Sequence, residues 1–168
     1  PAQSFGMALT TFVGQNIGAG KMHRVKEGLR ATMLMSVLCG IGAMVLVLTC
    51  GPNMMHLFSQ EAAVVEAGMD YLRPVMYCYL LFAIMNTVLS VLRGAGDMVF
   101  PMITSLLSLW IIRLPMAYLF SYWFGKEYIF FSYGGGWLIG MTMAIIYYFT
   151  GRWKKKAVVS KESEEGLQ

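Results

Sequence analysis

The sequence predicts an all-α fold, a polytopic bundle of membrane-spanning helices. Three observations carry this prediction: 57% of the 168 residues are hydrophobic, only 13% are charged, and the mean hydropathy is +0.59. Soluble domains are about 45–50% apolar and about 25% charged, so this chain has too few charged side chains to cover a water-exposed surface. Helices in lipid satisfy the backbone polar groups of such a chain internally.

Apolar stretches that we expect to form spans cover about residues 4–17, 31–50, 71–92, 102–124 and 135–150. The stretch 31–50 carries no charge and is long enough to cross about 30 Å of hydrocarbon. We expect this span to end at a turn formed by Gly51-Pro52-Asn53. The stretch 4–17 is too short for a full crossing, so we expect its helix to begin upstream of Pro1, in a longer protein.

Basic residues predict the orientation of these spans, because short basic loops resist translocation and stay in the cytoplasm. The segment from Gly14 to Arg30 holds four positive charges against one negative, between two apolar stretches. If spans alternate from this segment, ten basic residues fall on the inner side and two, Arg73 and Lys126, on the outer side. We therefore expect an inner (plasma) membrane protein with a cytoplasmic C-terminus and a disordered tail at 157–168. The net charge of +4 is thus a topology signal and does not indicate nucleic acid as a partner.

Small residues recur at every fourth position in two of the spans. These residues are Thr32, Ser36 and Gly40 in one span, and Gly136, Gly140 and Ala144 in the other. Small side chains at this spacing let helix backbones approach closely in a membrane. We expect both ridges to be buried between helices.

Polar side chains inside the spans are the candidates for lining a cavity. In the span 71–92, Tyr79, Asn86 and Ser90 share one helical face and should point at protein or water. Arg113 lies near the middle of its span, where an arginine costs about 2.5–3.5 kcal/mol to insert and needs a partner or a wet cavity. The full candidate set is Thr11, Gln15, Tyr79, Asn86, Ser90 and Arg113. The alternative role for these side chains is interhelical hydrogen bonding that only holds the bundle together, and for Gln15 a polar cap on a turn.

Other functional classes find little support. No serine–histidine–aspartate or cysteine–histidine set and no pair of intramembrane carboxylates can be proposed, so we expect neither an enzyme nor a cofactor. The odd number of cysteines and the two isolated histidines indicate neither a disulfide framework nor a metal site. Between Gly14 and Lys21 the glycine spacing does not fit a phosphate-binding loop.

Three segments in order, TTFVGQNIGAGKMHRVKEGLR, LRGAGDMVFPMI and RLPMAYLF, resemble the MATE (multidrug and toxic compound extrusion) family of transporters. This resemblance implies twelve helices in two six-helix lobes, around a central cavity that opens alternately to each side. Residues 1–156 would then be a partial C-terminal transmembrane lobe, helices eight to twelve, with the N-terminal lobe and the seventh helix as missing partners.

The resemblance also implies a function, a secondary active antiporter that exports drugs or other organic, often cationic, compounds in exchange for Na⁺ or H⁺. Small organic substrates and membrane lipid are the partners that it implies. A Na⁺ site in one branch of the family uses an acid on the tenth helix, but the corresponding span 71–92 has none, and Asn86 is its most polar member. The resemblance therefore does not extend to that site, and coupling could reside in the N-terminal lobe.

Two alternatives stay open at this point. A flippase for lipid-linked saccharides, from the same wider superfamily, would be expected to carry several cationic side chains in its cavity, whereas Arg113 is alone within its span. A non-transporting membrane scaffold would use the polar stripes only to pack its helices.

Overall fold

The computed structural model describes residues 1–154, apart from the side chains of Lys126 and Glu127, and every regular element in this part of the chain is helical. The elements are α1 (Ala2–Gly18), α2 (Met22–His56), α3 (Ala62–Gly94), α4 (Val99–Leu106), the π-helix η1 (Leu107–Arg113), α5 (Leu114–Trp123), the 3₁₀-helix η2 (Lys126–Phe131) and α6 (Ser132–Thr150). The predicted all-α bundle is therefore confirmed. The expected tail at 157–168 lies outside the described residues.

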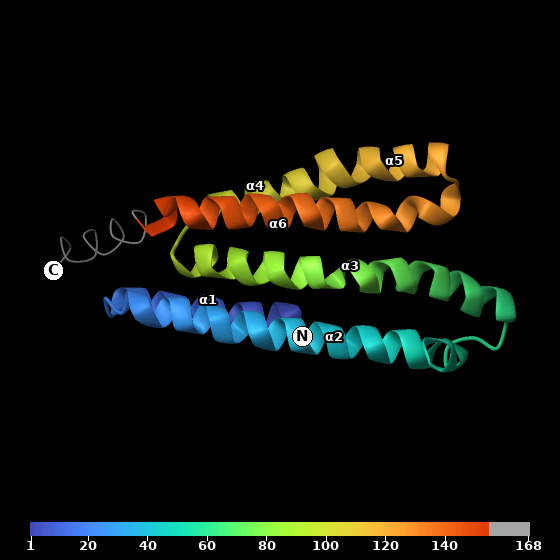
Figure 1. The fold of residues 1–168 in the computed structure, drawn as a ribbon, viewed down its shortest axis with the longest axis horizontal. Coiled ribbons are helices and arrows are strands. Elements are labelled where there is room, and N and C mark those ends of the chain that lie inside the picture. Colours follow the sequence, from blue (N-terminus) through green and yellow to red (C-terminus); the bar gives the residue numbers. More distant parts are fainter. Residues whose placement is uncertain (155–168) are drawn as a thin grey trace.

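The helices lie side by side and alternate in direction (Figure 1). One end of the bundle, on the left of the figure, collects the α1–α2 turn, the α3–α4 turn and the end of α6. The other end holds the α2–α3 and α5–α6 connections. The helix directions alternate as the charge pattern predicts. Lys21, Arg24 and Arg93 lie at or beside the turns of the first end, whereas Arg73 lies in the half of α3 that is nearer the second end.

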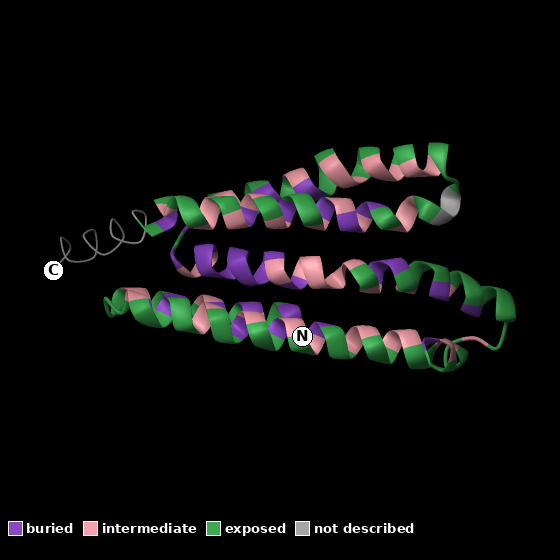
Figure 2. Ribbon diagram, viewed as in Figure 1, coloured by how far each residue is buried: buried purple, intermediate pink, exposed green. Residues whose placement is uncertain are grey.

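Four helical segments within residues 1–154 are long and apolar enough to cross a membrane. They are Met22–His56, Ala62–Gly94, Val99–Trp123 and Tyr128–Thr150. Helix α1 has 17 residues and runs beside only part of α2, as expected for a stretch too short to cross (Figure 1). Of the four, α3 is the central helix, because 56% of its most apolar window is buried against 11% for α2 (Figure 2).

The prediction of a turn at Gly51-Pro52-Asn53 is wrong, because α2 continues through Pro52 to His56. Pro52 cannot donate the helical hydrogen bond to the carbonyl of Leu48, and its ring crowds that carbonyl, so the helix continues here at a local cost. Gly51 is buried, and a Cβ there would lie 2.8 Å from the Met69 sulfur. Packing on α3 therefore holds the helix together past its proline.

Both small-residue ridges are buried, as predicted. Gly40 on α2 faces α3, where a Cβ on this glycine would lie 3.0 Å from Leu80. On α6, a Cβ on Gly140 would lie 2.6 Å from the sulfur of Met85 and 3.4 Å from the hydroxyl of Ser108. Helices α3, η1 and α6 thus meet at Gly140, where a larger side chain would have to displace its neighbours.

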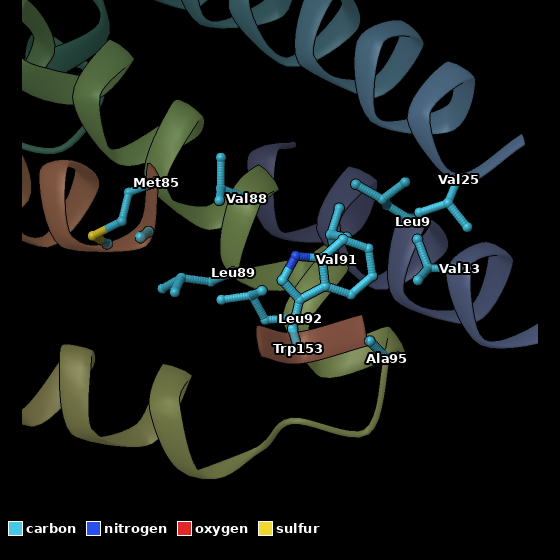
Figure 3. Close-up of a cluster of buried hydrophobic side chains, with 11 residues drawn as sticks. Leu9, Val13, Val25, Met85, Val88, Leu89, Val91, Leu92, Ala95 and Trp153 are labelled. Atoms are coloured by element: carbon cyan, nitrogen blue, oxygen red, sulfur yellow. The ribbon is translucent and has the colours of Figure 1, made fainter. Parts of the chain in front are cut away.

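A hydrophobic cluster joins α1, α2, α3 and the residues after α6 (Figure 3). Val13, Val25 and Leu92 belong to it, and Trp153 is only 2% exposed. The indole N–H of Trp153 donates to the backbone oxygen of Tyr148 at 3.0 Å. The chain beyond α6 is therefore pinned against the bundle.

Candidate functional site

Helices α1 and α3 cross closely because glycines face each contact. A Cβ on Gly94 would lie 2.5 Å from the carbonyl oxygen of Thr10 and 2.8 Å from the Cβ of Val13. A Cβ on Gly6 would lie 2.5 Å from the side-chain nitrogen of Asn86. A larger residue at Gly94 would force the two backbones apart, so the separation depends on glycine.

Polar side chains bridge this crossing. The Asn86 side-chain Nδ2 donates to the carbonyl oxygen of Ala2 at 2.9 Å. The single hydroxyl proton of Thr10 is shared between the carbonyl oxygens of Gly6, at 2.9 Å, and Ser90, at 3.2 Å. The hydroxyl of Ser90 donates back to the Asn86 carbonyl oxygen at 2.7 Å. Each hydrogen bond gives a partner to a polar side chain that would otherwise be unpaired in an apolar interior.

Arg93 adds a positive charge to the same crossing. It lies at the end of α3, and its guanidinium Nη1 reaches back to 3.5 Å from both Asn86 Oδ1 and Ser90 Oγ. The side chain is half-buried. Sequence reading placed Arg93 only in a cytoplasmic turn, although its spacing of three residues from Ser90 and seven from Asn86 puts all three on one helical face.

Asp97 ties the α3–α4 turn to α6. The hydroxyl of Tyr147 donates to its Oδ2 at 2.6 Å, and the carboxylate also accepts from the Phe100 backbone N–H at 3.4 Å. The rings of Phe100 and Tyr147 stack with centroids 3.7 Å apart. Sequence reading missed this contact, because nothing local connects residues fifty positions apart.

Arg113 borders a cavity of about 370 Å³ between η1, α5, η2 and α6. The walls are mainly apolar and aromatic, with Leu109, Trp110, Leu114, Phe130 and Tyr133 among them. The Arg113 guanidinium carbon lies 3.4 Å from the centre of the Tyr133 ring, a cation–π contact.

Pro115 explains the π-helix that carries Arg113. Its ring nitrogen cannot donate to the preceding turn, and the ring crowds the carbonyl of Ile111. The seven residues from Leu107 to Arg113 then adopt the wider π-helical winding. The wider turn places Arg113 over α6, where Tyr133 lies.

The six predicted residues fall in four places, and Arg113 alone borders the cavity beside α5. Asn86 and Ser90 lie buried at the α1–α3 crossing, in the interhelical hydrogen bonds that were the alternative role. Thr11 and Gln15 are exposed on the other face of α1. Tyr79 packs beside Gly40 of α2, and its ring centroid lies 5.8 Å from that of Phe82. A part in transport for any of them stays a prediction.

The described residues offer no metal centre, since no three His, Cys, Asp or Glu side chains among residues 1–154 gather closely enough to hold an ion. Tyr133 was not among the candidate site residues predicted from the sequence. It has no local signal, because its partner Arg113 is on a different helix.

These helices and polar crossings define a multi-pass membrane protein. Residues 1–119 match the MatE family model, and the chain belongs to this family. The chain is 31% identical to the probable multidrug resistance protein YpnP of Bacillus subtilis, across 92% of this chain and 35% of that protein. It is 26% identical to the probable multidrug resistance protein NorM of Thermotoga maritima, across 99% of this chain and 36% of that protein.

A more distant relative is the human multidrug and toxin extrusion protein 1, which is 24% identical across 67% of this chain and 20% of its own length. The chain thus spans about a third of the length of its bacterial relatives. No solved structure matches it.

Proposed function

We propose that the chain is most of the C-terminal lobe of a secondary active antiporter. The whole protein would export drugs or other organic, often cationic, compounds in exchange for Na⁺ or H⁺ by alternating access. The observation that carries the proposal is the family match over residues 1–119, together with relatives named as multidrug resistance proteins. The N-terminal lobe and the seventh helix would complete the transport path.

The orientation of α1 supports this arrangement. Hydrogen bonds at the α1–α3 crossing and glycine contacts hold one face of α1 against α3. Thr11 and Gln15 therefore stand on the opposite, exposed face, together with Ser4. A mildly polar face on an otherwise apolar helix costs least where protein or water covers it. We infer that this face borders the path and meets the other lobe.

Alternating access requires the lobe to move as one body. The buried contacts of Asn86 and Ser90 would serve this role by keeping α1 fixed on α3, so that both helices move together. Arg113 would line the transport path or contact the substrate at the outer end of the path. We propose that the coupling ion binds in the part of the protein that lies outside this chain.

The charge pattern supports a cytoplasmic C-terminus and an inner-membrane location. The end of the bundle that gathers the α1–α2 turn and the end of α6 would then be the inner end. A flippase of the wider superfamily is less well supported, because Arg113 is the one charged side chain that borders the cavity among the described residues.

The test is efflux of a fluorescent organic cation from cells that lack, and then regain, the gene encoding this chain. Thr11→Val is expected to slow efflux several-fold. Thr49→Val is the matched control, because both threonines are exposed and each donates to the carbonyl four residues earlier. Efflux unchanged by loss of the gene would refute the proposal, and an equal effect of both variants at normal abundance would refute the role of α1.

A further inference from the structure

Two adjoining cavities lie where α2 begins and α6 ends. Their volumes are about 380 Å³ and 430 Å³, and both are lined by Lys26, Arg30, Tyr148 and Lys154. Two of these residues come from α2 and two from the other end of the chain, so the site exists only in the folded bundle. The cations are exposed and surround one shared space.

The fold builds this site by turning the chain after α6. Gly151 has a φ of 70°, a left-handed conformation that glycine adopts without strain, and it ends α6. Trp153 then enters the core cluster and stacks on Tyr148, with ring centroids 5.5 Å apart. Lys154 is thereby held next to the start of α2, and its ammonium lies 5.7 Å from the Trp153 ring. The backbone of Lys154 is therefore held in place by the packing of the preceding residue, Trp153.

The residues that line the cavities form a positively charged region and an apolar region. Lys26, Arg30 and Lys154 contribute three positive charges, and Glu27 is the one acidic side chain that lines either cavity within the described residues. Leu29 and the exposed ring of Phe149 form the apolar side of one cavity. Both helices continue from here as membrane-length apolar segments.

We propose that this basic cleft binds the phosphate headgroup of an anionic phospholipid, with an acyl chain along Leu29 and Phe149. Basic pockets between membrane helices at the bilayer surface suit such headgroups. A free phosphate would use the cations but not the apolar side, whereas a lipid uses both. The inference needs only a membrane protein, so it stands apart from the transport proposal and from which end faces the cytoplasm.

The experiment is native mass spectrometry of the chain in detergent, with cardiolipin, phosphatidylglycerol or phosphatidylcholine added. Lys26→Gln, Arg30→Gln and Lys154→Gln are combined in one variant. The matched control combines Lys21→Gln, Arg24→Gln and Arg152→Gln, which remove the same charge from the same two segments but do not line either cavity.

Each cation near a membrane surface strengthens binding roughly fivefold, the fold-change that about 1 kcal/mol corresponds to. The cleft variant is therefore expected to bind the anionic lipids up to about a hundredfold more weakly, while the control keeps most of its binding. A conservative variant, Lys26→Arg with Lys154→Arg, keeps all three charges and should keep binding. A far-ultraviolet circular dichroism spectrum equal to that of the unchanged chain would show that the cleft variant is folded.

Three results would overturn the inference. They are equal losses in the cleft variant and the control, binding of phosphatidylcholine as tight as that of the anionic lipids, and displacement of the lipid by glycerol phosphate at similar concentration. The last outcome would assign the site to a soluble phosphate compound.

Discussion

The close approach of α1 to α3 can be tested by adding one methyl group, in Gly94→Ala. The new Cβ would stand 2.5 Å from the backbone oxygen of Thr10 and 2.8 Å from the Cβ of Val13. Neither atom is the free end of a flexible side chain, so relief requires one helix to move away from the other. Overpacking of this kind costs about 1–3 kcal/mol.

Gly42→Ala is the matched control, because a Cβ on Gly42 of α2 would meet no described heavy atom within 4 Å. Alanine in place of an interior helical glycine stabilises a helix by about 0.5–1 kcal/mol. The two variants should therefore differ by about 1.5–4 kcal/mol in the free energy of unfolding.

Equilibrium unfolding of the detergent-solubilised protein, followed by far-ultraviolet circular dichroism, measures this difference. Hydrogen exchange provides a local readout, since amides of α1 should lose protection in Gly94→Ala and keep it in Gly42→Ala. Equal stability of the two variants, with α1 equally protected, would show that the helices do not pack at this separation.

Further predictions concern polar contacts and topology. Asn86→Leu removes the hydrogen bond to α1 and should lower the free energy of unfolding by about 0.6–1.7 kcal/mol. Thr142→Val, on an exposed face, should lower it less. The reverse order would contradict the hydrogen bond between α3 and α1. Tyr133→Leu removes the ring under the arginine and should destabilise by about 0.5–2 kcal/mol. Tyr133→Phe keeps the ring, loses only the hydroxyl contact with Tyr71, and should cost less, so equal losses would exclude the cation–π contact. Topology can be tested in a variant without native cysteines. Gln60→Cys should react with a membrane-impermeant thiol reagent outside intact cells, and Gly18→Cys should not. Labelling of Gly18→Cys alone would show that the topology is the reverse of the one proposed.

The sequence alone predicted the apolar helices and two of the helix faces that pack. Hydropathy and charge are local properties, so they located the apolar spans and the alternation of their ends. The ridge of Gly136, Gly140 and Ala144 was also readable, because a spacing of four defines one side of a helix whatever the partner is. Pro52 shows the limit of local signals, since a turn pattern was overridden by packing between α2 and α3.

The candidate site was only partly predictable. The polarity of Asn86 and Arg113 marked them as residues that need partners inside a membrane, but which partner each one finds depends on the crossing of helices. Arg113 meets Tyr133 because the π-helix turns it toward α6, and Asn86 meets a backbone oxygen because Gly6 lets α1 approach. Lys154 meets α2 because the chain turns at Gly151.

The sequence by itself therefore determined the class of protein, its spans and the faces that are buried, because each of these follows from side chains a few positions apart. Only the tertiary structure decided which polar groups are paired and where positive charges converge, because these contacts join residues far apart in the chain through interhelical distances that no local pattern records.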